Sequence, residues 1–178
     1  MMTYTMDIAG LKRDLPLCPV SDDLYIGAFV MFGDVEMTIH AAKELLKRAP
    51  EFDYIIAPEA KAIPLAYEMS RQSGKQWIPA RKGVKGYMAD PVIVEDQSIT
   101  TAGKQTLVID KKDLDYMNGK RILVVDDVIS TGGSLHALDA LAARSSGTIV
   151  AQAAVLAEGD AAERKDIIFL EPLPLFAH

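Results

Sequence analysis

The sequence predicts an α/β fold, in which a central, mostly parallel sheet is flanked by helices. Short apolar runs rich in β-branched residues alternate along the chain with longer segments whose apolar residues recur at helical spacing. This alternation predicts a parallel sheet, because each helix returns the chain to the edge where the next strand begins. The 178 residues, 49% hydrophobic and 25% charged, suit one globular domain, 1–178.

The N-terminal half divides into an arm and a series of strands and helices. Residues 1–22 are interpreted as an arm or small flap, because Pro16 and Pro19 interrupt any long helix. Asp34 is a candidate cap for the first helix. The expected elements are a strand at Leu24–Met31, a helix at Val35–Ala49, strands at Asp53–Ala57 and Gln76–Ala80, and a helix at Ile63–Arg71 between them.

A long irregular segment, residues 82–105, separates the two halves of the chain. It contains glycines, a proline and charges with little helical periodicity, and such a segment inside a domain is usually functional or disordered. Within it, Val92–Val94 and Ser98–Thr101 could pair as a hairpin. Beyond it we expect strands at Arg121–Val125, Gly147–Leu156 and Asp166–Leu170, and a helix at Leu135–Ala143.

Charge and composition exclude several classes of function. The net charge of −6 disfavours general nucleic-acid binding, because an acidic domain repels the phosphate backbone. No apolar run approaches the ~20 residues that a membrane helix needs. The N-terminal residues lack the pattern of a signal peptide, and Cys18 is the single cysteine, so we expect a cytoplasmic protein.

The strongest local pattern is the segment from Val124 to Ser134, Val-Val-Asp-Asp-Val-Ile-Ser-Thr-Gly-Gly-Ser. It describes a strand end, an acid pair, a loop of small residues and a helix start. Gly132 and Gly133 permit positive φ, and N–H groups that lead into a helix form an anion site. With the nearby hydroxyl groups, this segment predicts a cradle for a phosphate monoester.

Asp126 and Asp127 precede the cradle. Adjacent carboxylates are good acceptors for vicinal sugar hydroxyls and can bind magnesium through water. Together the two features match a ribose 5-phosphate. The competing interpretation is a strand that ends in a capped turn. Neither a P-loop nor a dinucleotide-binding glycine pattern is present.

These residues resemble a known family. Val124–Ser134 resembles the PRPP-binding signature of the type I phosphoribosyltransferases. Tyr54–Pro64 is similar to the pyrophosphate loop of the adenine and xanthine branch, and Arg81-Lys82 matches the basic pair that opens that branch's flexible loop. The resemblance covers roughly residues 24–156. It implies the family's fold, with a flexible lid at 82–105 and a small hood formed by the termini.

The resemblance also implies roles for individual residues. Asp126, Asp127, Lys61 and Arg81 are the expected catalytic residues, and the acid pair is also the expected Mg²⁺ site, through water. A cis peptide is expected between Glu59 and Ala60, and the implied assembly is a homodimer. The implied PRPP-binding residues are Asp126, Asp127, Val128, Ile129, Ser130, Thr131, Gly132, Gly133, Ser134, Glu59, Ala60, Lys61, Arg81, Lys82 and Lys85.

Several of these residues have simpler interpretations. Lys61 can be a solvated loop lysine, Arg81 and Lys82 an ordinary charged strand end, and Glu59 a helix cap. Trp77 and Tyr54 are expected in the core rather than against a base.

The implied reaction displaces pyrophosphate from PRPP by a nitrogen of a base, and we expect a purine. The family's adenine enzymes resemble one another in a loop of the form Leu-Glu-Tyr-Gly, and Thr101 stands where that acid would be. Glu95 or Asp96 could replace it. Two alternatives stay open: a PRPP-sensing regulator without catalysis, and a metal-binding phosphoacceptor or nucleotide-binding domain.

Overall fold

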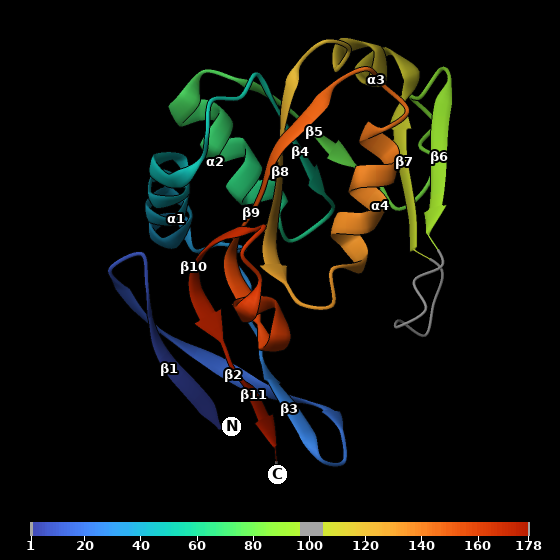
Figure 1. The fold of residues 1–178 in the computed structure, drawn as a ribbon. Coiled ribbons are helices and arrows are strands. Elements are labelled where there is room, and N and C mark those ends of the chain that lie inside the picture. The colour runs from blue at the N-terminus through green and yellow to red at the C-terminus, as the bar shows by residue number, and fades with distance from the viewer. Residues whose placement is uncertain (1, 97–104, 178) are drawn as a thin grey trace.

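The computed structural model describes residues 2–96 and 105–177. Its centre is a five-stranded parallel sheet with the strand order β10-β9-β8-β4-β5 (Figure 1). Every residue of β4 is buried, as expected for a parallel strand covered on both faces. The strands of this sheet are β4 (Tyr54–Pro58), β5 (Gln76–Ala80), β8 (Arg121–Ile129), β9 (Thr148–Glu158) and β10 (Ile168–Leu173).

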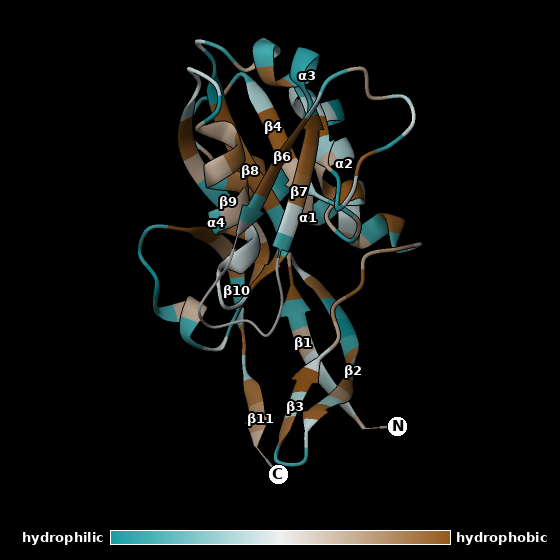
Figure 2. Cartoon of the chain, turned by 90° about the vertical axis from the view of Figure 1, so that its right-hand side faces the viewer, coloured by the Kyte–Doolittle hydropathy of each residue, from teal (hydrophilic) through white to brown (hydrophobic). Residues whose placement is uncertain are grey.

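Helices cover both faces of the sheet and enclose two hydrophobic clusters. The helices α1 (Val35–Arg48) and α2 (Ile63–Ser73) pack on one face. On the other face lie α4 (Gly133–Ala142), α3 (Lys111–Tyr116), and an antiparallel hairpin of β6 (Pro91–Asp96) and β7 (Gln105–Asp110). Hydrophobic residues are concentrated in the core strands, brown in Figure 2. The α/β prediction is therefore confirmed.

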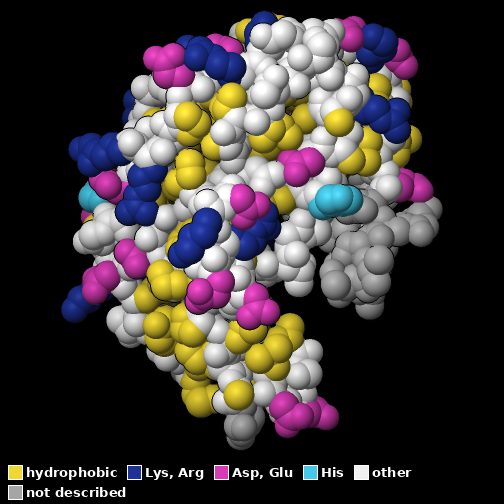
Figure 3. Space-filling view, viewed as in Figure 1, with side chains coloured by type: hydrophobic (Ala, Val, Ile, Leu, Met, Phe, Trp, Pro, Cys, Tyr) yellow, Lys and Arg dark blue, Asp and Glu magenta, His cyan; other side chains and the backbone are white. Residues whose placement is uncertain are grey.

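The two ends of the chain form a second sheet below the core (Figure 1). This four-stranded antiparallel sheet, which we call the hood, consists of β1 (Thr3–Ile8), β2 (Leu11–Ser21), β3 (Leu24–Gly27) and β11 (Leu175–Ala177). Hydrophobic side chains gather over this lower part of the molecule (Figure 3), and Met2, Val20 and Leu175 are among the exposed ones. A short 3-10 helix, η1 (Gly159–Glu163), leads from β9 towards β10.

The connections of the parallel sheet diverge between β4 and β8. After β4 the chain passes through α2 on one face to reach β5, whereas after β8 it passes through α4 on the other face to reach β9. Such a switch point leaves a crevice beyond the carboxyl ends of the two strands, and open α/β sheets bind their ligands there. The β4–α2 loop and the β8–α4 loop border this crevice.

The structure differs from the sequence-based expectations in several places. The strand expected at Leu24–Met31 ends at Gly27, and the residues expected as an arm form β1 and β2. We expected Val92–Val94 to pair with Ser98–Thr101 in a hairpin, and this expectation is wrong. Val92–Val94 belong to β6, which pairs with β7, and Val94 lies opposite Leu107. Ser98–Thr101 lie outside the described residues. Strand β8 runs four residues beyond Val125, so the acid pair lies within the sheet. The helix α3 was not expected.

Two further expectations concern the backbone and the helices. The peptide between Glu59 and Ala60 is cis, as predicted. Among the helices that the structure describes, none has both the length and the apolar character to cross a membrane.

Candidate active site

Strand β8 delivers the acid pair, Asp126 and Asp127, to the crevice. Both side chains are buried, with exposed fractions of 7% and 4%, and Asp126 Oδ1 accepts a hydrogen bond from the backbone N–H of Asp127 at 2.8 Å. The Lys61 ammonium lies 2.9 Å from Asp127 Oδ2. This contact lacks hydrogen-bond geometry, and the buried oxygen has no hydrogen-bond partner among the described residues. The pair therefore retains acceptor capacity on the side facing the crevice.

The electrostatics of the acid pair follow from its burial. Burial raises the pKa of Asp126 well above its ordinary value, and the neighbouring Asp127 raises it further, while the Lys61 charge opposes both effects. Negative charge at this position is thus poorly compensated by the protein. Hydroxyl donors or a cation bound in the crevice would supply the missing stabilisation.

The β8–α4 loop, residues 130–132, surrounds the first of two adjoining cavities. Gly132 has a φ of 84°, and α4 begins at the next residue, so the first N–H groups of the helix turn towards the loop. A Cβ atom at Gly132 would lie 3.2 Å from Nη1 of Arg164. The cavity measures about 270 Å³ and is lined by Gln105, Asp126, Val128, Ile129, Ser130, Thr131, Gly132, Gly133, Ser134 and Leu135.

The β4–α2 loop borders the second cavity and carries the cis peptide. Glu59 accepts hydrogen bonds from Arg81 Nε and from the backbone N–H of Lys82, both at 2.6 Å. Burial alone would raise the pKa of Glu59, but these two hydrogen bonds outweigh it and the net shift is downward. The cavity measures about 300 Å³ and is lined by Pro58, Glu59, Ala60, Lys61, Lys82, Gln105, Leu107, Asp126, Asp127, Val128 and Ser134.

The structure brings most of the residues singled out in the sequence around these two cavities. Arg81 is an exception, because its guanidinium is bound to Glu59 and to the Tyr87 hydroxyl. Lys85 lines neither cavity, although its charge lowers the pKa of Glu59. Thr101 lies outside the described residues, and Glu95 is exposed on β6.

Three of the simpler interpretations can be compared with the structure. Glu59 does not cap α2, whose N-cap is Ala62 and has no side-chain hydrogen bond. Lys61 is half exposed but paired with Asp127, so it is more than a solvated loop lysine. Tyr54 lies in the core as expected, with 3% of its surface exposed.

Sequence reasoning missed residues that contact the cavities from other elements. Gln105, the first residue of β7, lines both cavities, and Leu107 lines the second. No local motif marks either residue, because their proximity to Asp126 depends on how the β6–β7 hairpin packs beside α4. Only the tertiary arrangement reveals them.

The described residues contain no group of three or more His, Cys, Asp or Glu side chains arranged to hold a metal ion. The acid pair is the nearest candidate. Magnesium in proteins commonly keeps several waters and is held by one or two carboxylates together with substrate phosphates. The Asp127 oxygen that lacks a hydrogen-bond donor among the described residues and the raised pKa of Asp126 fit a cation held in that manner.

A crevice at a sheet switch point, with a helix start suited to an anion on one side and buried carboxylates beside it, is typical of α/β proteins with a phosphorylated ligand. Residues 36–171 match the model of the phosphoribosyl transferase domain family. The chain belongs to this family and is a phosphoribosyltransferase.

Similar proteins agree with that assignment. The chain is 31% identical over 149 residues to an adenine phosphoribosyltransferase of Thermosipho africanus, which covers 82% of this chain and 84% of the relative. A relative of the same name from Thermotoga petrophila is 30% identical over 157 residues, covering 83% and 85%.

Solved structures support the fold. The adenine phosphoribosyltransferase of Thermoanaerobacter pseudethanolicus superposes with a TM-score of 0.74 at 21% identity, covering 89% of this chain and 95% of that one. The Saccharomyces cerevisiae enzyme, solved with adenine and an imino-altritol bisphosphate, gives a TM-score of 0.69 at 20% identity, covering 88% and 93%.

Proposed function

We propose that this enzyme transfers the 5-phosphoribosyl group of PRPP to a purine base and releases pyrophosphate. The observation that carries the proposal is the pair of adjoining cavities that share Asp126 and Ser134, because a sugar phosphate needs hydroxyl acceptors next to an anion site. Adenine is the first acceptor to test, since the similar curated proteins are named adenine phosphoribosyltransferases.

In the proposed complex the β8–α4 loop binds the 5-phosphate through backbone N–H groups and the hydroxyls of Ser130, Thr131 and Ser134. The acid pair accepts hydrogen bonds from the ribose hydroxyls. The β4–α2 loop, with Glu59, Ala60 and Lys61, contacts pyrophosphate. Lys82 already lines the same cavity, and Arg81 lies beside it on Glu59. When PRPP binds, Arg81 would break its ion pair with Glu59 and form one with pyrophosphate.

The proposed chemistry needs no protein nucleophile. Positive charge develops on the ribose as the bond from C1 to pyrophosphate breaks, and negative charge collects on the departing pyrophosphate. Lys61 and Lys82, which line the second cavity, would stabilise that negative charge, and Arg81 would do so once it leaves Glu59. A bound Mg²⁺ would add charge compensation at the pyrophosphate and ribose oxygens.

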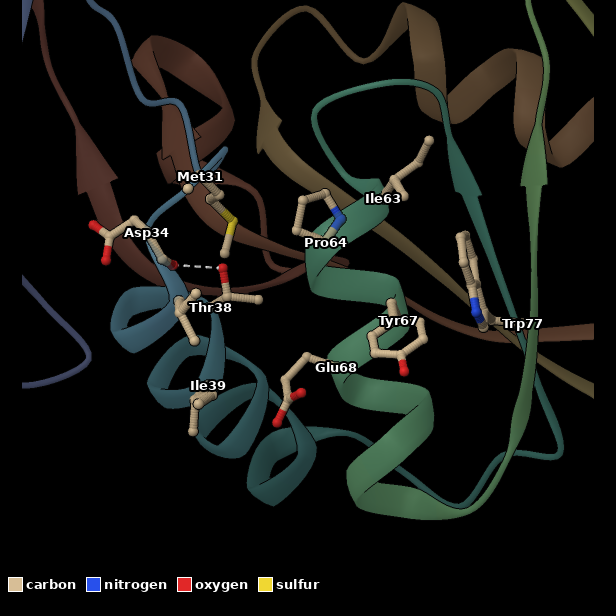
Figure 4. A pocket seen from close by; sticks show the side chains of 11 residues that line it. Met31, Asp34, Thr38, Ile39, Ile63, Pro64, Tyr67, Glu68 and Trp77 are labelled. Atoms are coloured by element: carbon tan, nitrogen blue, oxygen red, sulfur yellow. Dashed lines mark hydrogen bonds between the residues drawn. The ribbon is translucent and has the colours of Figure 1, made fainter.

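We also propose that the enzyme works in the cytoplasm as a homodimer. A groove of about 400 Å³ separates α1 from α2 and is lined mostly by apolar side chains, including Ile39, Tyr67 and Trp77 (Figure 4). Tyr67 is 59% exposed, so an apolar surface borders the groove. The groove begins at Ile63, two residues after Lys61, so a second copy seated there would lie next to the β4–α2 loop.

A neighbouring copy would also offer a binding role for Lys85. This residue lines neither cavity of its own chain. In a dimer across the α1–α2 groove, we expect Lys85 to contribute charge either to its own pyrophosphate site or to that of the partner.

The experiment that tests the function is a coupled screen for product. Purified protein, PRPP and Mg²⁺ are incubated with adenine, guanine, hypoxanthine, xanthine, uracil or orotate, and nucleotide formation is scored by chromatography. One productive purine supports the proposal. PRPP binding without turnover of any base would instead favour the sensing protein, for which the replacement of the loop acid by Thr101 is the motivating observation.

A further inference from the structure

Glu158 is a half-buried acidic residue at the end of β9 for which the proposed reaction has so far no use. It is the last residue of β9, which runs parallel to β8. In the register of the two strands Ala157 lies opposite Ile129, so Glu158 stands beside the point where the β8–α4 loop begins. The residue therefore lies at the same edge of the sheet as the acid pair and the anion site.

Strand β9, which ends at Glu158, runs towards the side of the core that faces the hood (Figure 1). Its register partner on β10 is Leu173. A Cδ atom of Leu173 lies 3.2 Å from the position that a Cβ at Gly27 would occupy, and Gly27 ends strand β3 of the hood. The carboxyl ends of β9 and β10 thus lie beside the hood.

The described part of the chain offers the Glu158 carboxyl one opposite charge, that of Lys61, and no hydrogen-bond donor. Burial raises its pKa, and the Lys61 ammonium, the one charged group of the packed elements that acts on it, opposes this. Among the described residues, none forms a hydrogen bond or an ion pair with its side chain. A partly desolvated carboxylate without a donor gains most from a bound N–H group.

The proposed PRPP complex indicates which ligand meets this carboxyl. The 5-phosphate, the ribose hydroxyls and pyrophosphate occupy the β8–α4 loop, the acid pair and the β4–α2 loop. C1 of the ribose would then lie between these groups, and a base that reaches it from the side of the hood would pass the end of β9.

We propose that Glu158 accepts a hydrogen bond from an N–H group of the acceptor base and so selects bases that carry an exocyclic amino group. The inference rests on the proposed function and deepens it. An ionised carboxylate can only accept hydrogen bonds, so it attracts an amino group and repels a carbonyl oxygen at the same position. Glu158 is then a specificity-determining residue on a different strand from the PRPP site.

The test compares wild type with Glu158→Gln, because glutamine keeps the size and can face either an amino or a carbonyl group. Steady-state kcat/KM is measured for adenine and for hypoxanthine, which carries oxygen in place of the amino group. In Glu158→Gln we expect kcat/KM for adenine to fall by about tenfold or more, mainly because KM rises. We expect little change for hypoxanthine, so the preference for adenine over hypoxanthine decreases. PRPP affinity stays unchanged. Glu163→Gln, an exposed position on η1, is the matched control and leaves the ratio unchanged.

Other outcomes overturn the inference or the function separately. An equal fall for both bases, or a fall in PRPP affinity, would mean a structural role for Glu158, and an unchanged ratio would mean no contact with the base. If wild type makes no nucleotide from any base, the proposed function fails. The inference is then tested by calorimetry, which measures the affinity for adenine in the presence of ribose 5-phosphate, where no transfer occurs. If wild type and Glu158→Gln bind adenine equally, or if neither binds it, the inference is wrong.

Discussion

At the scale of single residues, Gly132 is the position where the anion site depends most directly on the absence of a side chain. Its φ of 84° is costly for an L-residue, by about 1–2 kcal/mol, and a Cβ would crowd the Arg164 guanidinium at 3.2 Å. Gly132→Ala is therefore expected to weaken PRPP binding by about tenfold or more, measured by calorimetry.

Gly10 provides a matched control for this prediction. It has a similar φ of 81°, in the turn between β1 and β2, and a Cβ there would meet nothing within 4 Å. Gly10→Ala should destabilise the fold to a comparable extent while PRPP affinity stays at the wild-type value. Equal affinity losses in both variants would show that the effect of Gly132→Ala is general destabilisation rather than damage to the anion site.

The acid pair gives a second prediction, in which binding and stability separate. The double variant Asp126→Asn, Asp127→Asn should lose PRPP binding by about a hundredfold or more, because amides are weaker acceptors than carboxylates for hydroxyl groups and for hydrated magnesium. Its Tm should not fall, since burial already raises the pKa of Asp126 and a neutral side chain removes that cost.

Differential scanning calorimetry and PRPP titration measure the two effects on the same samples. Asp115→Asn is a suitable control, because Asp115 is an exposed residue of α3 paired with Lys111. A double variant that binds PRPP as well as wild type would remove the assignment of the ribose hydroxyls to this pair.

At the scale of secondary-structure elements, Asp34 joins the hood to the core. Its carboxylate accepts a hydrogen bond from the N–H of Met37 at the start of α1, and it pairs with Arg13 of β2 at 2.7 Å. The hydrogen bond from Arg13 is the main reason that the pKa of Asp34 lies below its ordinary value of 3.8. A lowered pKa means that the ionised form stabilises the fold, so this stabilisation is present above pH 3.8 and is lost as the pH falls through the lowered pKa.

Two substitutions at Asp34 should separate its contributions. At pH 7 Asp34→Asn keeps a capping oxygen and loses the ion pair, at a cost of up to about 1 kcal/mol. Asp34→Ala loses the cap as well, for about 1 kcal/mol more, and each kcal/mol lowers Tm by about 2–4 °C. The difference between wild type and Asp34→Asn should shrink as the pH falls below 3.8 and through the lowered pKa. A difference that persists at low pH would contradict the assignment to the ionised carboxylate.

The elements also show which features the sequence could predict. The strands β4, β5 and β8 and the helices α1, α2 and α4 were predicted within a few residues, because each shows a local period or a boundary residue such as Asp34. The glycine loop, the acid pair and the cis peptide of the site were found from contiguous motifs.

Features that depend on distant partners were not predictable in the same way. The partner of β6 is selected by the packing of the hairpin beside α4, and no pattern in Val92–Val94 encodes that choice. Gln105 reaches the crevice only because β7 begins beside it. Residues 1–22 were expected as an arm, because the two prolines of this segment suggest irregular structure. In the structure the segment forms the paired strands β1 and β2.

At the scale of the whole molecule, the α1–α2 groove sets the expected assembly. A stable dimer buries about 800 Å² on each partner around an apolar centre, and the exposed apolar residues along α1 and α2 supply such a centre. Wild type should sediment as a dimer, and Tyr67→Glu should sediment as a monomer, because a charge at this position would be desolvated by the second copy.

The hood offers the control for this last prediction. Val20 is 58% exposed on β2, close to the 59% of Tyr67, but it lies outside the groove. Val20→Glu should therefore remain a dimer in analytical ultracentrifugation at the same protein concentration. If Tyr67→Glu also remains a dimer, the groove is not the interface, and a monomeric wild type would exclude the dimer itself. If the monomeric Tyr67→Glu binds PRPP normally but turns over slowly, the partner subunit contributes to the pyrophosphate site, and Lys85 is the residue to substitute next.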